Sequence, residues 1–191
     1  MHRIFQNDIF FHGLVKYHIE NISCFDSEVV EAGKVFEIGD VAVKPFSIPH
    51  DAAEPFGFAF EMDGKKLSVA TDMGKIDVNV AENVRGSDFV FLEANHDTEM
   101  LRTGPYPFYL KQRIIGSDGH LSNDQCASLA AALARTGTRR FVLGHLSNTN
   151  NTPQIALKTV SDFLLAGGFE VGNDVEIDVA KRHSIGRIYE I

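Results

Sequence analysis

The sequence predicts an α/β fold, and three observations support this class. Short apolar runs with strand character alternate along the chain with longer amphipathic or alanine-rich stretches. Glycine, proline and an Asp-Gly pair punctuate these stretches. Several of the apolar runs end in a histidine or a carboxylate. Alternating strands and helices with polar residues at the strand ends are typical of an α/β protein.

The composition indicates a single soluble domain. A chain of 191 residues with 44% hydrophobic residues is long enough to bury a core, so we expect one domain over residues 1–191. No apolar run approaches the about 18 residues of a membrane span, which predicts no membrane partner. No signal-type segment follows Met1, and Cys24 and Cys126 are the only cysteines. These features fit a reducing cytoplasm.

The net charge of −8 limits how this protein could bind a polyanion. Binding would require a metal centre or a local basic patch, because the overall surface is acidic. One candidate patch comprises Arg102, Lys111 and Arg113, with further arginines at 135, 139 and 140. The alternative is that these cations are ordinary solvated residues.

The first part of the chain reads mainly as strands after one helix. Apolar residues recur at three- and four-residue intervals over residues 4–20, which predicts a helix. Asp63-Gly64 predicts a hairpin turn between two strands. The expected strands cover residues 35–38, 41–48, 56–62 and 66–71.

The second part alternates helices and strands. Ser122 is placed to cap a helix, and Thr152 followed by Pro153 predicts another helix start. The expected helices cover residues 76–85, 123–135 and 153–165, and an irregular or short-helical passage over residues 104–109 leads to residues 110–115. The expected strands cover residues 88–92, 140–144, 175–179 and 185–191.

The segment Gly-His-Leu-Ser-Asn occurs twice, at residues 119–123 and 144–148. Either copy could be a helix N-cap, because Ser and Asn cap helices before apolar runs. Either histidine could instead be a ligand or catalytic group at a loop. His145 leaves a predicted buried strand and is the better metal-ligand candidate. His120 precedes a predicted helix and is the better proton donor.

Polar side chains gather at the ends of the predicted strands. They are His50, Asp72, Glu93 with His96, His120 and His145. Imidazole nitrogens and carboxylate oxygens without cysteine suit Zn²⁺, Mn²⁺ or Fe²⁺. Asp72 alone could be an ordinary turn residue. Because it follows the strand end Ser-Val-Ala-Thr and precedes Met-Gly, its carboxylate can also project into a site.

Several of these segments resemble a known family. Pro-His-Asp at residues 49–51, Ala-Thr-Asp-Met-Gly at 70–74 and Leu-Gly-His-Leu-Ser-Asn at 143–148 resemble the later metal-binding motifs of metallo-β-lactamase-fold hydrolases. Glu-Ala-Asn-His-Asp at 93–97 and Gly-Pro-Tyr-Pro at 104–107 resemble the YycJ or WalJ subgroup. The resemblance covers roughly residues 35–165 and implies an αββα sandwich.

The resemblance also implies roles for the candidate residues. Asp72 would bridge two divalent metal ions, zinc or manganese, with His50 on one ion and His145 on the other. The two ions would activate a water for attack on phosphorus or a carbonyl. His120 would help the leaving oxygen depart, and Glu93 would orient that imidazole.

Four further residues are candidates for contacting the substrate. Ser147, Asn148 and Asn151 follow the last ligand and could hydrogen-bond a phosphate. Arg113 belongs to the candidate basic patch and could contact the same anion.

One departure from the family pattern matters for the interpretation. The signature His-x-His-x-Asp-His, which supplies four ligands in the family, does not occur in the 191 residues. We therefore expect a partial domain that corresponds to the C-terminal two-thirds of the fold, from a truncated gene or an incomplete gene model. The three remaining ligands, His50, Asp72 and His145, could hold at most one ion weakly.

The leading functional interpretation is a metal-dependent hydrolase. The resemblance implies a phosphodiesterase, specifically a DNA exonuclease linked to repair, with nucleic acid or another phosphodiester as substrate and with impaired activity in this chain. Two alternatives stay open. One is a catalytically inactive binding or regulatory remnant. The other is a hydrolase of small molecules with the same fold. Whether this chain is itself an enzyme stays open, because four ligands are missing.

Overall fold

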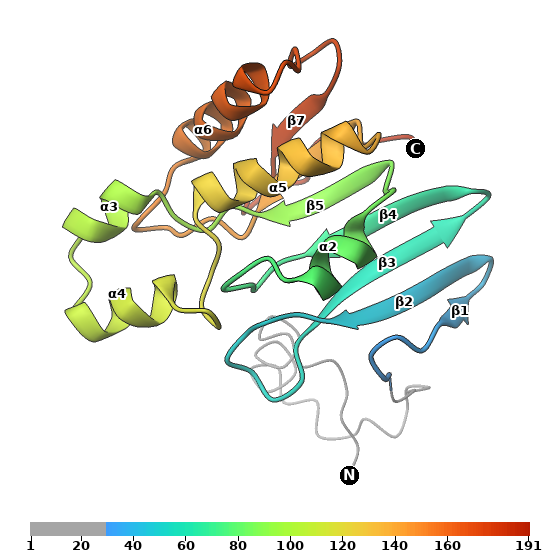
Figure 1. The fold of residues 1–191 in the computed structure, drawn as a ribbon, viewed down its shortest axis with the longest axis horizontal. Coiled ribbons are helices and arrows are strands. Elements are labelled where there is room, and N and C mark those ends of the chain that lie inside the picture. The colour runs from blue at the N-terminus through green and yellow to red at the C-terminus, as the bar shows by residue number, and fades with distance from the viewer. Residues whose placement is uncertain (1–29) are drawn as a thin grey trace.

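A seven-stranded mixed sheet forms the centre of the described structure. The computed structural model describes residues 30–191, so the helix expected over residues 4–20 lies outside the described residues. Neighbouring strands in the sheet follow chain order from β1 to β7 (Figure 1). The strands are β1 Phe36–Ile38, β2 Val41–Ser47, β3 Phe56–Met62, β4 Lys65–Ala70, β5 Phe89–Glu93, β6 Arg140–Gly144 and β7 Glu176–Val179.

The pairing changes direction at β4. Strands β1 to β4 pair antiparallel, and strands β4 to β7 pair parallel. The hairpin between β3 and β4 turns at Asp63 and Gly64, which have φ angles of 52° and 76°. Two consecutive positive φ angles are the requirement of a type I′ turn, so the predicted hairpin is confirmed.

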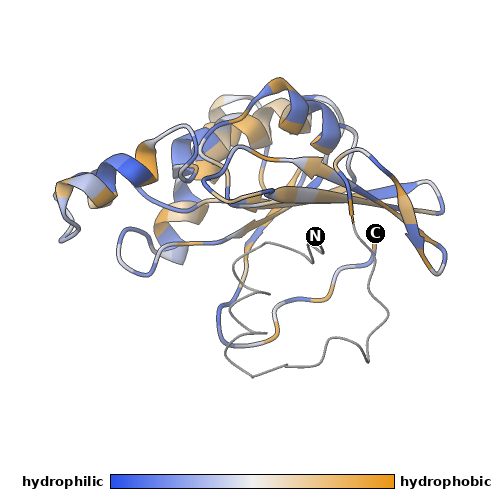
Figure 2. Ribbon diagram, turned by 90° about the horizontal axis from the view of Figure 1, so that it is seen from below, coloured by the Kyte–Doolittle hydropathy of each residue, from blue (hydrophilic) through white to orange (hydrophobic). Residues whose placement is uncertain are grey.

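Helices cover one face of the sheet. The described helices are α2 Val78–Val84, α3 Thr98–Thr103, α4 Phe108–Ile115, α5 Asn123–Arg135 and α6 Pro153–Ala166. The helices lie on the same side of the sheet (Figures 1 and 2). A strand order that advances in one direction from β4 to β7 places every right-handed crossover on one face. None of the described helices combines the length and apolar character needed to cross a membrane.

The helix starts follow local capping chemistry. Ser122 and Gln125 form a reciprocal capping box at the start of α5, and Thr152 caps α6 with Pro153 in its first turn. Both predicted starts are confirmed. Helix α3 was not predicted. Its cap is Asp97, whose carboxylate accepts a hydrogen bond from the Met100 N–H.

The two faces of the sheet carry different side chains. Buried residues on the helix side include Ala59, Ala70, Val90, Leu92, Phe141 and Leu143. Their neighbours along the same strands point to the other side and are buried less completely; they include Phe58, Phe60, Val69 and Phe91.

The C-terminal segment lies against this second face. The Tyr189 ring packs edge-on against Phe89 with a centroid distance of 5.1 Å, and Ile191 lies beside Phe60 and Leu67. The strand predicted over residues 185–191 is therefore wrong. The segment leaves the plane of the sheet and contacts its face instead of adding to its edge.

Five strands deliver their C-terminal ends to the same edge of the sheet. Strands β4, β5, β6 and β7 are parallel, and β2 runs in the same direction because it reaches β4 through the antiparallel β3. In register, Ala70 pairs with Leu92, and Glu93 pairs with Gly144. The residues that follow these strands therefore converge at one edge.

His96 links this edge to helix α5 from inside the protein. It forms an isolated β-bridge with Ser122, and its carbonyl accepts a hydrogen bond of 2.8 Å from the Asn123 N–H. The side chain is buried, with 2% of the residue exposed, and Nδ1 has no hydrogen-bond partner among the described residues. Burial lowers the pKa of His96 to about 4.

This buried histidine predicts a loss of stability in mild acid. The unfolded chain binds a proton at His96 near its ordinary pKa, whereas the folded chain binds it only near pH 4. The free energy of unfolding therefore decreases by up to about 3 kcal/mol as the pH falls from about 6.5 to about 4. Urea unfolding across this range should show that the variant His96→Gln has a shallower pH dependence. His183→Gln, which changes an exposed histidine, is the control, and equal slopes for both variants would contradict the prediction.

Candidate metal centre

Five of the predicted site residues meet where the strands end. His50 follows β2, Asp72 follows β4, Glu93 is the last residue of β5, and His145 directly follows β6. His120 comes from the loop between α4 and α5. Asp72, Glu93, His120 and His145 offer ligand atoms that all lie within 4.8 Å of one another.

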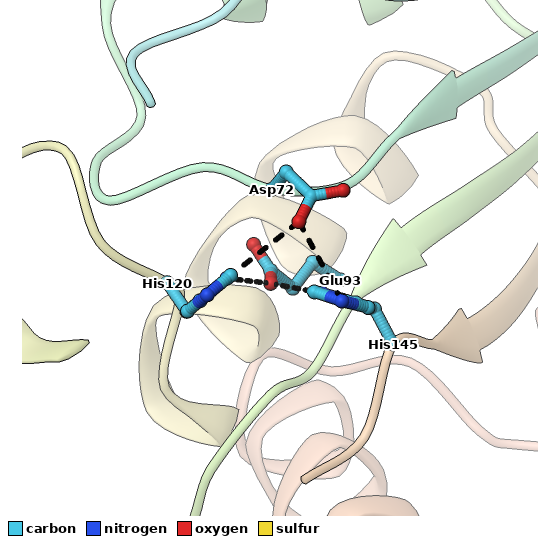
Figure 3. A group of neighbouring side chains, drawn as sticks. All are labelled: Asp72, Glu93, His120 and His145. Atoms are coloured by element: carbon cyan, nitrogen blue, oxygen red, sulfur yellow. Dashed lines mark hydrogen bonds and ion pairs between the residues drawn. The ribbon is translucent and has the colours of Figure 1, made fainter. Parts of the chain in front are cut away.

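The carboxylate of Glu93 connects the two histidines of the repeated segment. Its Oε1 lies 2.8 Å from Nδ1 of His120 and 2.7 Å from Nδ1 of His145. Its Oε2 accepts a hydrogen bond of 2.7 Å from the Met73 N–H. Figure 3 shows the two imidazole rings on either side of this carboxylate, with Asp72 facing them. Glu93 itself is completely buried.

The hydrogen bonds fix the protonation pattern of both histidines. Burial raises the pKa of Glu93, but the hydrogen bonds and charges of His120 and His145 outweigh it and hold the pKa below its ordinary value. Glu93 is therefore ionised and can only accept hydrogen bonds. Each histidine must then donate its Nδ1–H, which leaves Nε2 as the atom available to a ligand.

His50 is oriented in the same way by a backbone carbonyl. Its Nδ1 lies 3.2 Å from the carbonyl oxygen of Gly119, which can only accept a hydrogen bond. Its Nε2 lies 3.8 Å from Oδ1 of Asp72. Nε2 of His145 lies 3.5 Å from the same oxygen.

Oδ1 of Asp72 and either of the two Nε2 atoms are close enough to be ligands of a divalent metal ion, and the group whose ligand atoms all lie within 4.8 Å of one another contains His145 but not His50. Ligands on a tetrahedral zinc with bonds of about 2.05 Å lie about 3.3 Å apart, close to the separations around Asp72. Each imidazole also donates its other N–H to a carboxylate or a carbonyl, as metal-binding histidines usually do. Glu93 fits a ligand role less well, because both of its oxygens already accept hydrogen bonds inside the protein.

The electrostatics of the site favour a cation. Burial lowers the pKa of His145, but its hydrogen bond to Glu93 and the charges of Asp72 and Glu93 outweigh this and raise it above the ordinary value. A raised histidine pKa reports a negative local potential. The same potential attracts a divalent metal ion.

Two of the site residues adopt unusual backbone conformations. Asp72 and His145 have φ angles of 60° and 55°, in the left-handed region that residues with a Cβ rarely occupy. Asn95 supports His145 from both sides: its side-chain amide donates to the His145 carbonyl at 2.9 Å, and its own carbonyl accepts from the Ser147 N–H at 2.8 Å.

The loop of Asp72 is packed against the loop of His120 through a glycine. A Cβ at Gly74 would lie 2.4 Å from the backbone nitrogen of Gly119, too close for any other residue. The Gly74 N–H also donates to the Pro49 carbonyl at 2.9 Å. The segments that carry His50, Asp72 and His120 are therefore held together.

The residues that were predicted to hydrogen-bond a phosphate lie next to the site, but two of them form hydrogen bonds within the protein. The Ser147 hydroxyl accepts hydrogen bonds from the backbone N–H groups of Thr149 and Asn150, and Asn148 is exposed. Asn151 is buried, and its amide bonds to Asn123 and to the Ala94 carbonyl. To contact a phosphate, Asn151 would have to give up these internal bonds.

The predicted basic patch is largely neutralised. Arg113 forms a paired hydrogen bond with Asp51 and lowers the pKa of that carboxyl. Arg102 pairs with Glu99, and Lys111 donates to the Arg102 carbonyl. These cations mainly stabilise the helices and loops that carry them.

Two features of this edge were not predicted from the sequence. One is Asn95, although the polar run at residues 93–97 was a signal for it. The other is the basic triplet Lys181-Arg182-His183, which lines the cavity beside His145 together with Asn148. Three consecutive basic residues in an acidic chain could have indicated it.

A family model described as "Beta-lactamase superfamily domain" matches residues 14–146. The chain belongs to this superfamily. Two similar relatives carry the names Exodeoxyribonuclease YycJ, from Bacillus anthracis, and Exodeoxyribonuclease WalJ, from Streptococcus pneumoniae serotype 2. The first is 36% identical and the second 34%, over 85% and 84% of this chain. The chain spans 62% and 60% of their lengths, about three fifths of each.

Two solved structures share this fold. The metallo-β-lactamase-fold protein YhfI from Bacillus subtilis aligns with a TM-score of 0.58 at 12% identity and covers 86% of this chain and 59% of its own. A diphosphatase of the PhnP family aligns with a TM-score of 0.55 at 19% identity and covers 88% and 51%. The predicted fold class is confirmed.

The geometry predicts that Glu93 controls metal affinity without binding the metal. The variant Glu93→Gln removes the charge that orders His120 and His145, and we expect it to weaken zinc binding by about 10- to 100-fold. Competition with a chromophoric chelator measures the affinity, and circular dichroism checks that the variant is folded. The control is Glu99→Gln, which changes an exposed carboxylate on α3. Equal affinity of Glu93→Gln and Glu99→Gln would show that Glu93 does not position the ligands.

Proposed function

We propose that this superfamily member is a metal-dependent phosphodiesterase that acts on DNA. The observation that carries the proposal is the convergence of His50 Nε2, Asp72 Oδ1 and His145 Nε2, with each imidazole held through Nδ1. The relatives named as exodeoxyribonucleases support DNA as the substrate and hydrolysis as the reaction. A role in DNA repair and a cytoplasmic location are further parts of the proposal and rest on the sequence resemblance.

In this proposal the three donors hold one divalent ion, zinc or manganese. The ion would supply Lewis acidity and positive charge beside the scissile phosphate. The sequence contains no His-x-His-x-Asp-His segment to provide further ligands for a second ion. We therefore expect weak binding of a single ion and slow turnover by this chain.

His120 is proposed to protonate the leaving oxygen. Glu93 fixes its ring through Nδ1, so Nε2 is the atom that can carry the proton to the substrate. The ring lies beside those of His50 and His145, with centroid distances of 5.1 Å to each, so a group bound at the metal donors is within its neighbourhood. Glu93 then acts as a positioning residue for both His120 and His145.

The test combines metal stoichiometry with hydrolysis of DNA. We expect about one zinc or manganese ion per chain and slow, metal-dependent release of nucleotides from end-labelled DNA. Asp72→Asn should abolish both, because it replaces the charged oxygen of the shared donor with a neutral amide. His120→Ala should keep the metal affinity and slow hydrolysis by about 10²- to 10⁴-fold. Asp162→Asn, which changes an exposed carboxylate on α6, is the matched control.

Three outcomes would contradict this proposal. Absence of metal binding in the folded chain would favour a binding or regulatory protein. Cleavage of a small phosphodiester dye without cleavage of DNA would favour a small-molecule hydrolase. Loss of the metal in His120→Ala would show that His120 is a ligand and not the proton donor.

A further inference from the structure

A cavity of about 790 Å³ lies directly beside His145. One wall consists of the loop after β6, with Ser147 and Asn148, and of the start of helix α6 at Thr152. The other wall is the segment after β7, residues 180–184. The volume falls in the range of about 300–1,000 Å³ that is common for ligand sites.

The lining of this cavity is basic in an acidic protein. The whole chain has 26 Asp and Glu residues and 18 Lys and Arg residues, yet none of the residues that line the cavity is acidic. Lys181, Arg182 and His183 stand consecutively on one wall, and all three are exposed. The other residues of the lining, apart from His145, carry no charge.

The two cations of this wall are not neutralised by carboxylates. Some other cations in the described part of the chain, such as Lys65, Arg140 and Lys158, lie within 4 Å of a carboxylate. Lys181 and Arg182 form no ion pair with any described residue. Unpaired cations beside an anionic substrate keep their full charge for binding it.

The basic wall is fixed to the strand that carries His145. The Ala180 N–H donates to the Leu143 carbonyl at 2.8 Å, which continues the pairing of β7 with β6. The Arg182 guanidinium donates to the carbonyl of Leu146, directly after His145. The wall is thus held in place relative to the metal donors.

We propose that this cavity, called the groove below, binds the phosphodiester backbone of a single DNA strand next to the bond that is cut. Lys181 and Arg182 contact its phosphates, and the polar groups of Asn148 and His183 line its path. A positively charged groove that follows the backbone binds a single strand with little sequence preference. The inference rests on the proposed function and adds the position of the strand.

The test measures DNA binding without catalysis. Fluorescence anisotropy of a labelled single-stranded oligonucleotide is recorded with EDTA over a series of salt concentrations. The double variant Lys181→Gln/Arg182→Gln should bind more weakly than the wild type for every sequence tried. Its slope of log affinity against log salt should be shallower by about 0.7 per lost phosphate contact, or about 1.4 in total.

The matched control removes the same charges from the opposite edge of the sheet. Lys65 is the first residue of β4 and Arg139 directly precedes β6, whereas His145 follows the end of β6. Lys65→Gln/Arg139→Gln should keep the salt slope of the wild type. An equal loss of DNA affinity in both double variants would show that binding depends on the overall charge and would contradict binding in the groove. Unchanged binding in Lys181→Gln/Arg182→Gln would overturn it as well.

Failure of the groove can be separated from failure of the proposed function. If the wild type degrades DNA and Lys181→Gln/Arg182→Gln has the same KM, the groove does not bind the substrate, whereas the proposed function is supported. If the wild type binds DNA through the groove but does not cleave it with metal present, DNA binding by the groove is supported and the proposed phosphodiesterase activity is contradicted. The full inference predicts a raised KM for DNA with little change in kcat at saturation.

Discussion

The candidate site depends on the buried carboxylate of Glu93. A fully buried charge is costly unless hydrogen-bond donors surround it, and here two imidazoles and a backbone N–H supply them. These donors come from the ends of three separate segments, at Met73, His120 and His145. Satisfying one carboxylate therefore brings together loops that are far apart in the sequence and sets which ring nitrogens face Asp72.

Backbone strain collects around the same point. Left-handed conformations at residues such as Asp72 and His145 cost on the order of 1–3 kcal/mol each and persist only where the surroundings enforce them. The surroundings do so through the hydrogen bonds of Asn95 to the His145 loop and through the close approach of Gly74 to Gly119. These conformations occur at two residues that follow the strand ends and carry candidate ligand atoms.

Much of the fold could be predicted because its signals are local. The Asp63-Gly64 turn and the caps at Ser122 and Thr152 depend on neighbouring residues only, and the elements beside them were predicted to within a residue or two. Helix α3 was not predicted because one polar run, residues 93–97, both ends strand β5 and supplies the cap of α3. The segment over residues 185–191 has strand-like isoleucines, but its contacts with the sheet face are set by tertiary packing. For the same reason, the sequence indicated the site residues but not that one oxygen of Glu93 bonds to both His120 and His145, which lie 27 and 52 positions away.

The most direct test of this account is the tautomer of the three histidines in side-chain proton–nitrogen NMR spectra. The measurement belongs above the raised pKa of His145, so that the ring is neutral. The account predicts that His50, His120 and His145 carry their protons on Nδ1, and that zinc shifts the Nε2 resonances of His50 and His145. A proton on Nε2 of His120 or His145 in the metal-free chain would contradict it, because Glu93 could not then accept from both rings.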